Sequence, residues 1–114
     1  MTIREIIART GGTIRCGEHR GSDTVTQAFC SDLMSDVLTL NCQDLILITG
    51  LANVQAIRTA EMADIPYVLF VRDKDVTDEM VRIGKENNMV LAQCSCSMFK
   101  AAGELYKAGL KPVF

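Results

Sequence analysis

The feature that most constrains this sequence is a fully apolar run of strand length that recurs along the chain, each time followed by a helical pattern. The clearest runs are Leu45–Ile48, Tyr67–Val71 and Met89–Ala92. Strands that lack polar alternation are those that helices cover on both faces, and alternation of strands with helices is typical of parallel sheets. The sequence therefore predicts a three-layer α/β/α fold with a mainly parallel sheet of four to five strands and right-handed crossovers.

The segments before these runs are shorter and more polar. Thr2, with Glu5 three positions later, predicts a capping box at the start of a short helix that ends at Gly11-Gly12. Thr13–Cys16 predicts a short edge strand, and Val25–Cys30 predicts a further strand that precedes the next helix. Together with the three later runs, this makes four repeats of strand followed by helix.

Size and charge exclude several classes of protein. The 114 residues fit a single domain, residues 1–114. A net charge of −2 provides no basic patch that could displace counterions from nucleic acid. No apolar run approaches the roughly 20 residues that span a bilayer, and the start of the chain lacks the apolar region of a signal peptide. We expect a cytoplasmic protein that binds neither nucleic acid nor a membrane.

Candidate ligand-binding residues follow the predicted strands. Ligands of open parallel sheets bind where the strands end, and helix N-termini there favour anions. The residues that follow the predicted strands also include Ser35 and Asp36, Arg72 and Lys74, and Gln93 to Ser97. The predicted ligand-binding residues are Ser31, Asp32, Thr49, Gly50, Asn53, Cys94 and Ser95. The alternative for Ser31, Asn53 and Ser95 is that they only cap helices, which is the commonest role of these residue types there.

No set of catalytic residues is complete. Asp32 and Asp36 are one helical turn apart and could serve acid–base chemistry or bind a hard cation; the alternative is that they face solvent or complement a helix dipole. His19 is the only histidine and we expect it to be exposed. The glycine spacing of Gly12–Gly17 matches a Walker A loop, but the Lys and the Ser or Thr are missing. We therefore assign no catalytic residues and expect no cofactor.

Cys94-Ser95-Cys96 is the most chemically suggestive string in the chain. Thiols near a helix N-terminus can have a lowered pKa and be reactive. The spacing is neither that of redox pairs nor that of zinc ribbons, so we assign no metal site. An iron–sulfur cluster would need further ligands from Cys16, Cys30 or Cys42.

Three segments carry a resemblance to a known family, and the order of segments matches it over nearly the whole chain. These segments are Cys30–Val37, Ile48–Asn53 and Met98–Gly109. They resemble the DRTGG domain, a small module similar to the amino-terminal domain of HPr kinase/phosphatase. The likeness is greater to the stand-alone versions, which occur in anaerobes beside iron-hydrogenase genes, than to copies fused to CBS-domain regulators. The resemblance implies a regulatory or ligand-sensing module that often dimerises.

Two functions are favoured from the sequence, ahead of a third, an enzyme that uses Asp32 or Cys94, for which no catalytic set is complete. The first is a non-catalytic regulatory module that binds a small anionic ligand, a nucleotide or phosphorylated metabolite, where the strands end. The second is a redox or metal-binding accessory protein that uses Cys94 and Cys96, linked through the resemblance to iron-hydrogenase systems. We also expect a homodimer, both from the resemblance and from an exposed apolar end of the chain formed by Leu110, Val113 and Phe114.

Overall fold

The computed structural model describes residues 1–114 and contains one six-stranded sheet in the order β1-β5-β4-β3-β2-β6. Every neighbouring pair is parallel except β1 with β5, which is antiparallel at one edge. This confirms the predicted mainly parallel sheet. The strands are β1 (Thr13–Cys16), β2 (Gln27–Cys30), β3 (Leu45–Thr49), β4 (Tyr67–Phe70), β5 (Val90–Gln93) and β6 (Lys111–Pro112).

The sixth strand goes beyond the predicted four to five. It consists of only two residues, Lys111 and Pro112, which pair with Gln27 and Ala28 of β2. Proline is tolerated there because β6 lies at the edge of the sheet, where no further ladder bond is required.

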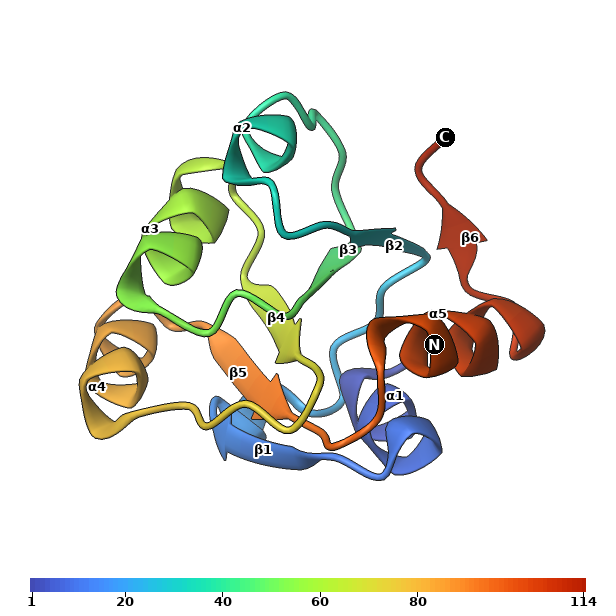
Figure 1. Ribbon diagram of the computed structural model, residues 1–114, viewed down its shortest axis with the longest axis horizontal. Helices are drawn as coiled ribbons and strands as arrows, with labels where there is room; N and C mark the ends of the chain where they lie inside the picture. The colour runs from blue at the N-terminus through green and yellow to red at the C-terminus, as the bar shows by residue number, and fades with distance from the viewer.

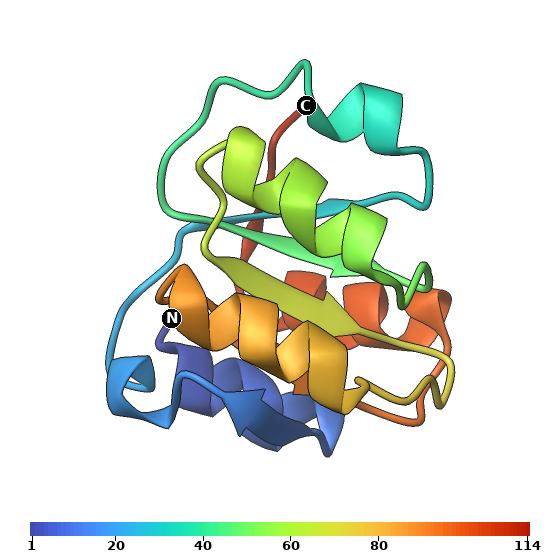
Figure 2. The same cartoon turned by 90° about the vertical axis from the view of Figure 1, so that its left-hand side faces the viewer.

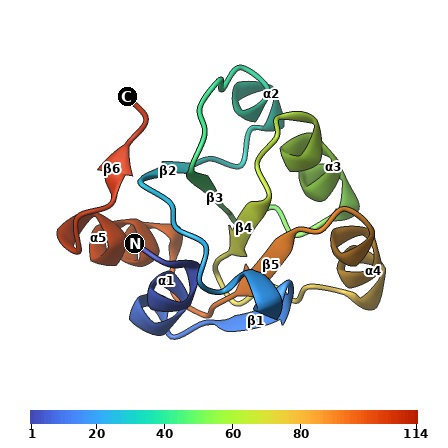
Figure 3. The same cartoon turned by 180° about the vertical axis from the view of Figure 1, so that it is seen from behind.

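The chain has five helices, and they cover both faces of the sheet (Figure 1). Helices α1 and α5 lie side by side on one face (Figure 3), and α2, α3 and α4 lie on the other. None of these helices combines the length and apolarity needed to cross a membrane. The helices are α1 (Ile3–Thr10), α2 (Met34–Val37), α3 (Val54–Met62), α4 (Asp78–Glu86) and α5 (Met98–Lys107), and a 3-10 turn, η1, spans Glu18–Arg20.

The sheet separates two apolar cores. All five residues of β3 are buried, and they alternate between the two sides. Leu45 and Leu47 pack with α2, α3 and α4, whereas Ile46 and Ile48 pack with α1 and α5. Side chains on both faces of the strand must therefore be apolar, which is the physical reason for the uninterrupted apolar runs.

Several predicted helix ends are confirmed by their hydrogen bonds. The Glu5 amide donates to Thr2 Oγ1 at 3.1 Å, and Gly11 ends α1 with a left-handed φ of 66°. Only this half of the predicted capping box is present, because the Glu5 side chain does not return a bond to Thr2. Asn53 caps α3 by accepting from the Ala56 amide at 2.9 Å.

Two predicted caps are wrong. Helix α2 starts at Met34, so Ser31 precedes it by three residues and instead accepts from the Leu33 amide at 3.0 Å. Helix α5 is capped by Ser97 rather than Ser95. In both cases the chain makes an extra turn after the strand before the helix begins. Ser97 then caps α5, whereas α2 begins after Leu33 without a side-chain cap.

The expectation of an exposed apolar chain end also needs correction. Leu110 is buried in the core beside α5, and Val113 is half-buried. The Leu110 amide donates to the Leu105 carbonyl at 3.0 Å, which folds this residue back under the helix. Phe114 alone is 90% exposed.

Candidate functional site

The carboxyl ends of β2, β3, β4 and β5 lie at one edge of the sheet, which we call the rim. Cys30 pairs with Ile48, Ile48 with Leu69 and Leu69 with Ala92, so these four strands end at nearly the same level. Figure 2 shows the arrows of β3 and β4 pointing to this edge. The residues that follow the strands are thereby brought to one side of the molecule, as the sequence predicts for a parallel sheet.

The first part of the rim, which we call the carboxylate corner, consists of Asp32, Thr49, Gly50 and Arg72. Asp32 Oδ1 accepts the Gly50 amide at 2.7 Å and the Thr49 hydroxyl at 3.0 Å. The Thr49 oxygen in turn accepts the Leu51 amide at 3.1 Å. The Asp32 carboxylate therefore occupies two donors that a bound anion would otherwise use.

Arg72 extends from the end of β4 across Gly50. A Cβ atom on Gly50 would lie 3.2 Å from Arg72 Nε and 3.4 Å from Asp32 Oδ2, so glycine leaves room for both side chains. The ion pairs of the chain are Arg20–Asp23 and Arg82–Glu86. Arg72 is exposed and its guanidinium makes neither an ion pair nor a hydrogen bond within the chain.

The backbone beneath this guanidinium is unusual. Arg72 and Asp73 have φ values of 67° and 59°, in the left-handed region that non-glycine residues seldom adopt. The other non-glycine residues with positive φ are all Asp or Asn, whose short side chains tolerate this conformation. The Arg72 amide donates to the Cys96 carbonyl at 2.8 Å and the Asp73 amide to the Cys94 carbonyl at 3.1 Å. These two bonds hold the strained pair in place.

The second part of the rim, the cysteine corner, contains Cys94, Cys96 and the end of α1. The two sulfur atoms are 3.3 Å apart, and Cys96 Sγ also lies 3.8 Å from the Thr10 carbonyl oxygen, to which it donates. A Cβ atom on Gly12 would lie 2.8 Å from the Gln93 carbonyl oxygen. Glycine at this position therefore lets the chain after α1 approach the end of β5.

The Cys94 thiol is held in its neutral form. Burial, followed by its contact with the Cys96 sulfur, raises the pKa of Cys94 from 9.0 to about 12. This is opposite to the lowering that a helix N-terminus can produce. Cys94 thus stays protonated at neutral pH, whereas Cys96 is the more accessible of the two sulfurs.

A polar cavity of about 200 Å³ opens beside the cysteine corner. It brings together residues from the end of α1, the start of β1, the turn after β4 and the end of β5. Its lining residues are Gly11, Thr13, Asp73, Lys74, Gln93, Cys94 and Ser95.

The predicted ligand-binding residues thus divide into groups. Asp32, Thr49 and Gly50 contact one another, and Cys94 and Ser95 share the polar cavity. Ser31 and Asn53 bond instead to nearby backbone amides.

The proposed pairing of the two aspartates on one helix is wrong. Asp36 lies exposed on α2, but Asp32 precedes that helix and turns toward Gly50. A carboxylate that accepts two short hydrogen bonds at the end of β3 cannot also line up with Asp36 along a helix face.

Cys30 ends β2 at the rim and packs against the same apolar core as Cys94 and Cys96, whereas the other two cysteines and the histidine lie elsewhere. Cys16 contacts the Met89 carbonyl oxygen at 3.6 Å, and Cys42 is half-buried in the loop before β3. No group of three or more His, Cys, Asp or Glu side chains in the structure could hold a metal ion. His19 is exposed, as expected, and lies 2.9 Å from Asn88 Oδ1.

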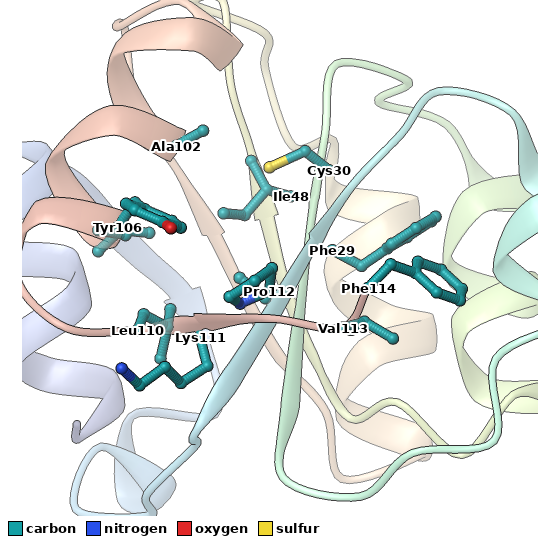
Figure 4. A pocket seen from close by; sticks show the side chains of 12 residues that line it. Phe29, Cys30, Ile48, Ala102, Tyr106, Leu110, Lys111, Pro112, Val113 and Phe114 are labelled. Carbon is teal, nitrogen blue, oxygen red and sulfur yellow. The ribbon is translucent and has the colours of Figure 1, made fainter.

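Two features were not found by sequence reasoning. One is the approach of Gly11 and Gly12 to β5, for which the only sequence signal was the glycine pair itself. The other is an apolar cavity of about 260 Å³ between β2, β6 and α5, where Cys30, Tyr106 and Pro112 face the opening (Figure 4). Its walls come from segments far apart in the chain, so no local pattern could reveal it.

Comparison with known proteins gives one informative likeness. No known protein-family profile matches the chain, and no curated protein sequence matches it. A similar solved structure contains the CBS and DRTGG domains of the regulatory region of Clostridium perfringens pyrophosphatase, complexed with its activator diadenosine tetraphosphate. The matched part of that regulatory region has the same fold as the present chain. The TM-score is 0.74 at 11% sequence identity, over 96% of this chain and 47% of that one, so the present chain spans about half of its length.

Proposed function

We propose that this chain is a non-catalytic regulatory module that senses a small anionic ligand at the rim. The observation that carries the proposal is the guanidinium of Arg72, which lies at the end of the sheet with no carboxylate or carbonyl partner. Guanidinium groups bind phosphate and carboxylate through two parallel hydrogen bonds. An anion would supply the acceptors that the chain itself does not.

The backbone of Arg72 supports the same assignment. Left-handed conformations cost free energy at residues other than glycine, and such strain clusters at ligand sites. Here Arg72 carries it, and the next residue, Asp73, adopts the same left-handed conformation. Lys74 follows directly and lines the polar cavity, so a second cation lies beside the first along the chain.

Asp32 determines which part of the rim is available to an anionic ligand. Its carboxylate already occupies the Gly50 amide and the Thr49 hydroxyl, so a second anion at that spot would face repulsion. The ligand therefore contacts the outward side of the guanidinium and the polar cavity. Asp32 orders the loop around Gly50 and does not itself bind the anion.

A nucleotide is the favoured ligand. The structural neighbour is a regulatory region in complex with diadenosine tetraphosphate, and the segments quoted above resemble DRTGG domains. We propose that the present chain is a domain of this type. A phosphorylated metabolite without a base is the competing ligand, because Arg72 would recognise either through its phosphate.

The test is binding of adenine nucleotides and sugar phosphates to wild type and variants, first by thermal shift and then by calorimetry. Arg72→Gly removes the cation while keeping a residue that adopts positive φ readily. We expect this variant to bind at least about tenfold more weakly, as for loss of a charge-assisted hydrogen bond worth about 1.5–3 kcal/mol. Arg72→Lys should retain part of the affinity, since it keeps the charge but loses the paired geometry.

Arg82→Gln is the matched control, because Arg82 pairs with Glu86 on the exposed side of α4. It should bind as wild type does. If no anion raises the midpoint of the wild-type protein, or if Arg72→Gly binds with unchanged affinity, the rim is not the sensing site.

We also propose that the module acts as a homodimer. Phe114 is 90% exposed and Tyr106 is 69% exposed; both border the apolar cavity. Exposed aromatic side chains beside an apolar hollow are typical of association surfaces. Sedimentation of the wild type should give twice the monomer mass and Phe114→Asp should give the monomer; a monomeric wild type at working concentration would refute this part.

The alternative is an accessory protein with either a metal centre or redox-active thiols, and the geometry supports the thiols better than the metal centre. A metal centre would need ligands beyond Cys94 and Cys96, and no group of three or more His, Cys, Asp or Glu side chains in the structure could hold a metal ion. The 3.3 Å separation of the two sulfurs favours thiol chemistry within the pair.

A further inference from the structure

We propose that Cys94 and Cys96 form a reversible intramolecular disulfide, and that this bond changes the position of Arg72 and hence anion binding at the rim. The first part depends only on the two thiols. The second part rests on the proposed function, because it concerns the same guanidinium.

The two thiols are already close enough to react with each other. Their sulfur atoms are 3.3 Å apart, against about 2.0 Å in a disulfide. Cys96 is partly exposed and Cys94 is buried, so an oxidant meets Cys96 first. No other sulfur contacts either of them, so each has the other as its ready partner.

The chemistry needs an external two-electron oxidant, for which we name a low-molecular-weight disulfide. The Cys96 thiolate attacks one sulfur of this disulfide, forms a mixed disulfide and releases one small thiolate. The Cys94 sulfur, after losing its proton, then attacks Cys96 and expels the second small thiolate. The two protons of the protein thiols end on the two released thiolates, so the protein is oxidised by two electrons and the reagent is reduced by two.

The order of attack follows from the environment of Cys94. Burial and the neighbouring sulfur raise the pKa of its thiol to about 12, so it is a poor nucleophile toward a reagent in solution. Once Cys96 carries the mixed disulfide, the attack becomes intramolecular. Proximity then compensates for the small thiolate fraction.

The bond is linked to the rim by backbone hydrogen bonds. Closing a ring across Ser95 changes the backbone from Cys94 to Cys96, because only one residue separates the two cysteines. The Cys96 carbonyl accepts the Arg72 amide at 2.8 Å, and the Cys94 carbonyl accepts the Asp73 amide at 3.1 Å. These amides belong to the two left-handed residues, so a movement of the carbonyls shifts the strained turn that carries the guanidinium.

The covalent part is tested by mass spectrometry after equilibration with mixtures of reduced and oxidised glutathione. Trypsin releases residues 86–100 as one peptide that contains both Cys94 and Cys96 and no other cysteine. We expect this peptide to lose two hydrogens reversibly, while Cys42→Ser, which removes a half-buried thiol elsewhere, oxidises in the same way. A peptide that keeps both thiols in fully oxidised glutathione, or that pairs with another cysteine, would overturn the proposal.

The coupling is tested without any ligand by amide NMR. Oxidation should shift the Arg72 and Asp73 amide signals and speed their hydrogen exchange, whereas signals of β2 amides stay in place. Cys96→Ser, which cannot form the bond, should show no change on treatment with oxidant. If the Arg72 and Asp73 signals stay unchanged in a protein whose disulfide has formed, the proposed coupling is wrong, although the disulfide itself is confirmed.

The consequence for binding is measured last, with inorganic pyrophosphate as the probe. We expect the dissociation constants of the oxidised and reduced proteins for pyrophosphate to differ by about fivefold or more, which is the size typical of coupling between two sites. Equal affinity of both forms contradicts the regulatory part. Failure of the reduced protein to bind any anion contradicts the proposed function instead, since the mass and NMR results do not depend on it.

Discussion

The two corners of the rim differ in the contacts that hold the strand end in place. In the carboxylate corner, Asp32 accepts the free donors of Thr49 and Gly50, so the strand end is closed by charge and hydrogen bonds. In the cysteine corner, the end of β5 is closed by contact, with Gly12 packed against Gln93 and two sulfurs 3.3 Å apart. Electrostatic interactions hold the carboxylate corner together, whereas close packing holds the cysteine corner together.

This difference indicates which corner tolerates change. Side-chain ends move easily, whereas backbone atoms in a packed sheet do not. Arg72 spans the two corners, with its side chain over Gly50 and its backbone bonded to Cys96. In the proposed coupling, it is therefore the residue that links the two corners.

The largest expected effect is a difference in the free energy of unfolding between a glycine substitution in each corner. Gly12→Ala places a Cβ atom 2.8 Å from a backbone carbonyl oxygen, so the chain must shift, at a cost of about 2 kcal/mol in the free energy of unfolding. Gly50→Ala meets only the Arg72 and Asp32 side chains, at 3.2 to 3.4 Å, and should cost about 0.5 kcal/mol. Urea denaturation of both variants measures this, and equal losses would erase the distinction between the corners.

The next effect concerns charge. Asp32→Asn removes the carboxylate beside Gly50 but keeps an oxygen that can accept the same bonds. We expect anion affinity to rise about tenfold, because repulsion between like charges at the rim is lost. Calorimetry with inorganic pyrophosphate is the measurement and Asp36→Asn, on the exposed side of α2, is the control. An unchanged affinity would mean that Asp32 lies outside the electrostatic reach of the ligand.

A smaller effect tests the hydroxyl that links Asp32 to β3. Thr49→Val keeps the shape but removes the donor to Asp32 and the acceptor of the Leu51 amide. The cost should be about 1 kcal/mol. Thr49→Ser restores both bonds and should recover most of the loss in a denaturant titration; if Ser and Val variants are equally stable, the hydroxyl does not contribute.

The smallest effect appears at alkaline pH and belongs to the cysteine corner. The pKa of Cys94 is raised from 9.0 to about 12 on folding, so the folded state keeps a proton that the unfolded chain loses. This contribution is fully present below the unfolded pKa and is lost as pH rises from about 9 toward 12. Cys94→Ala should therefore lose less stability than wild type between about pH 8 and pH 10. Asp32→Asn should keep the wild-type slope, and identical slopes in all three proteins would contradict the assignment.

Local patterns predicted much of the architecture. The apolar runs at Leu45–Ile48 and Tyr67–Val71 report burial on both faces, which any strand between two helix layers requires. Caps at Thr2 and Asn53 depend on amides only three residues away, so they too can be inferred from sequence. The predicted rim follows from parallel strands alone.

What the sequence by itself determined is therefore the layered sheet, the helix ends at Thr2, Gly11 and Asn53, and the side on which polar residues gather. Only the tertiary structure decided the strand order, the burial of Leu110, the bonds of Asp32, the passage of Arg72 over Gly50 and the pairing of Cys94 with Cys96. The reason is that periodicity records the environment of each segment separately, whereas these contacts depend on loop conformations and on packing between segments far apart in the chain.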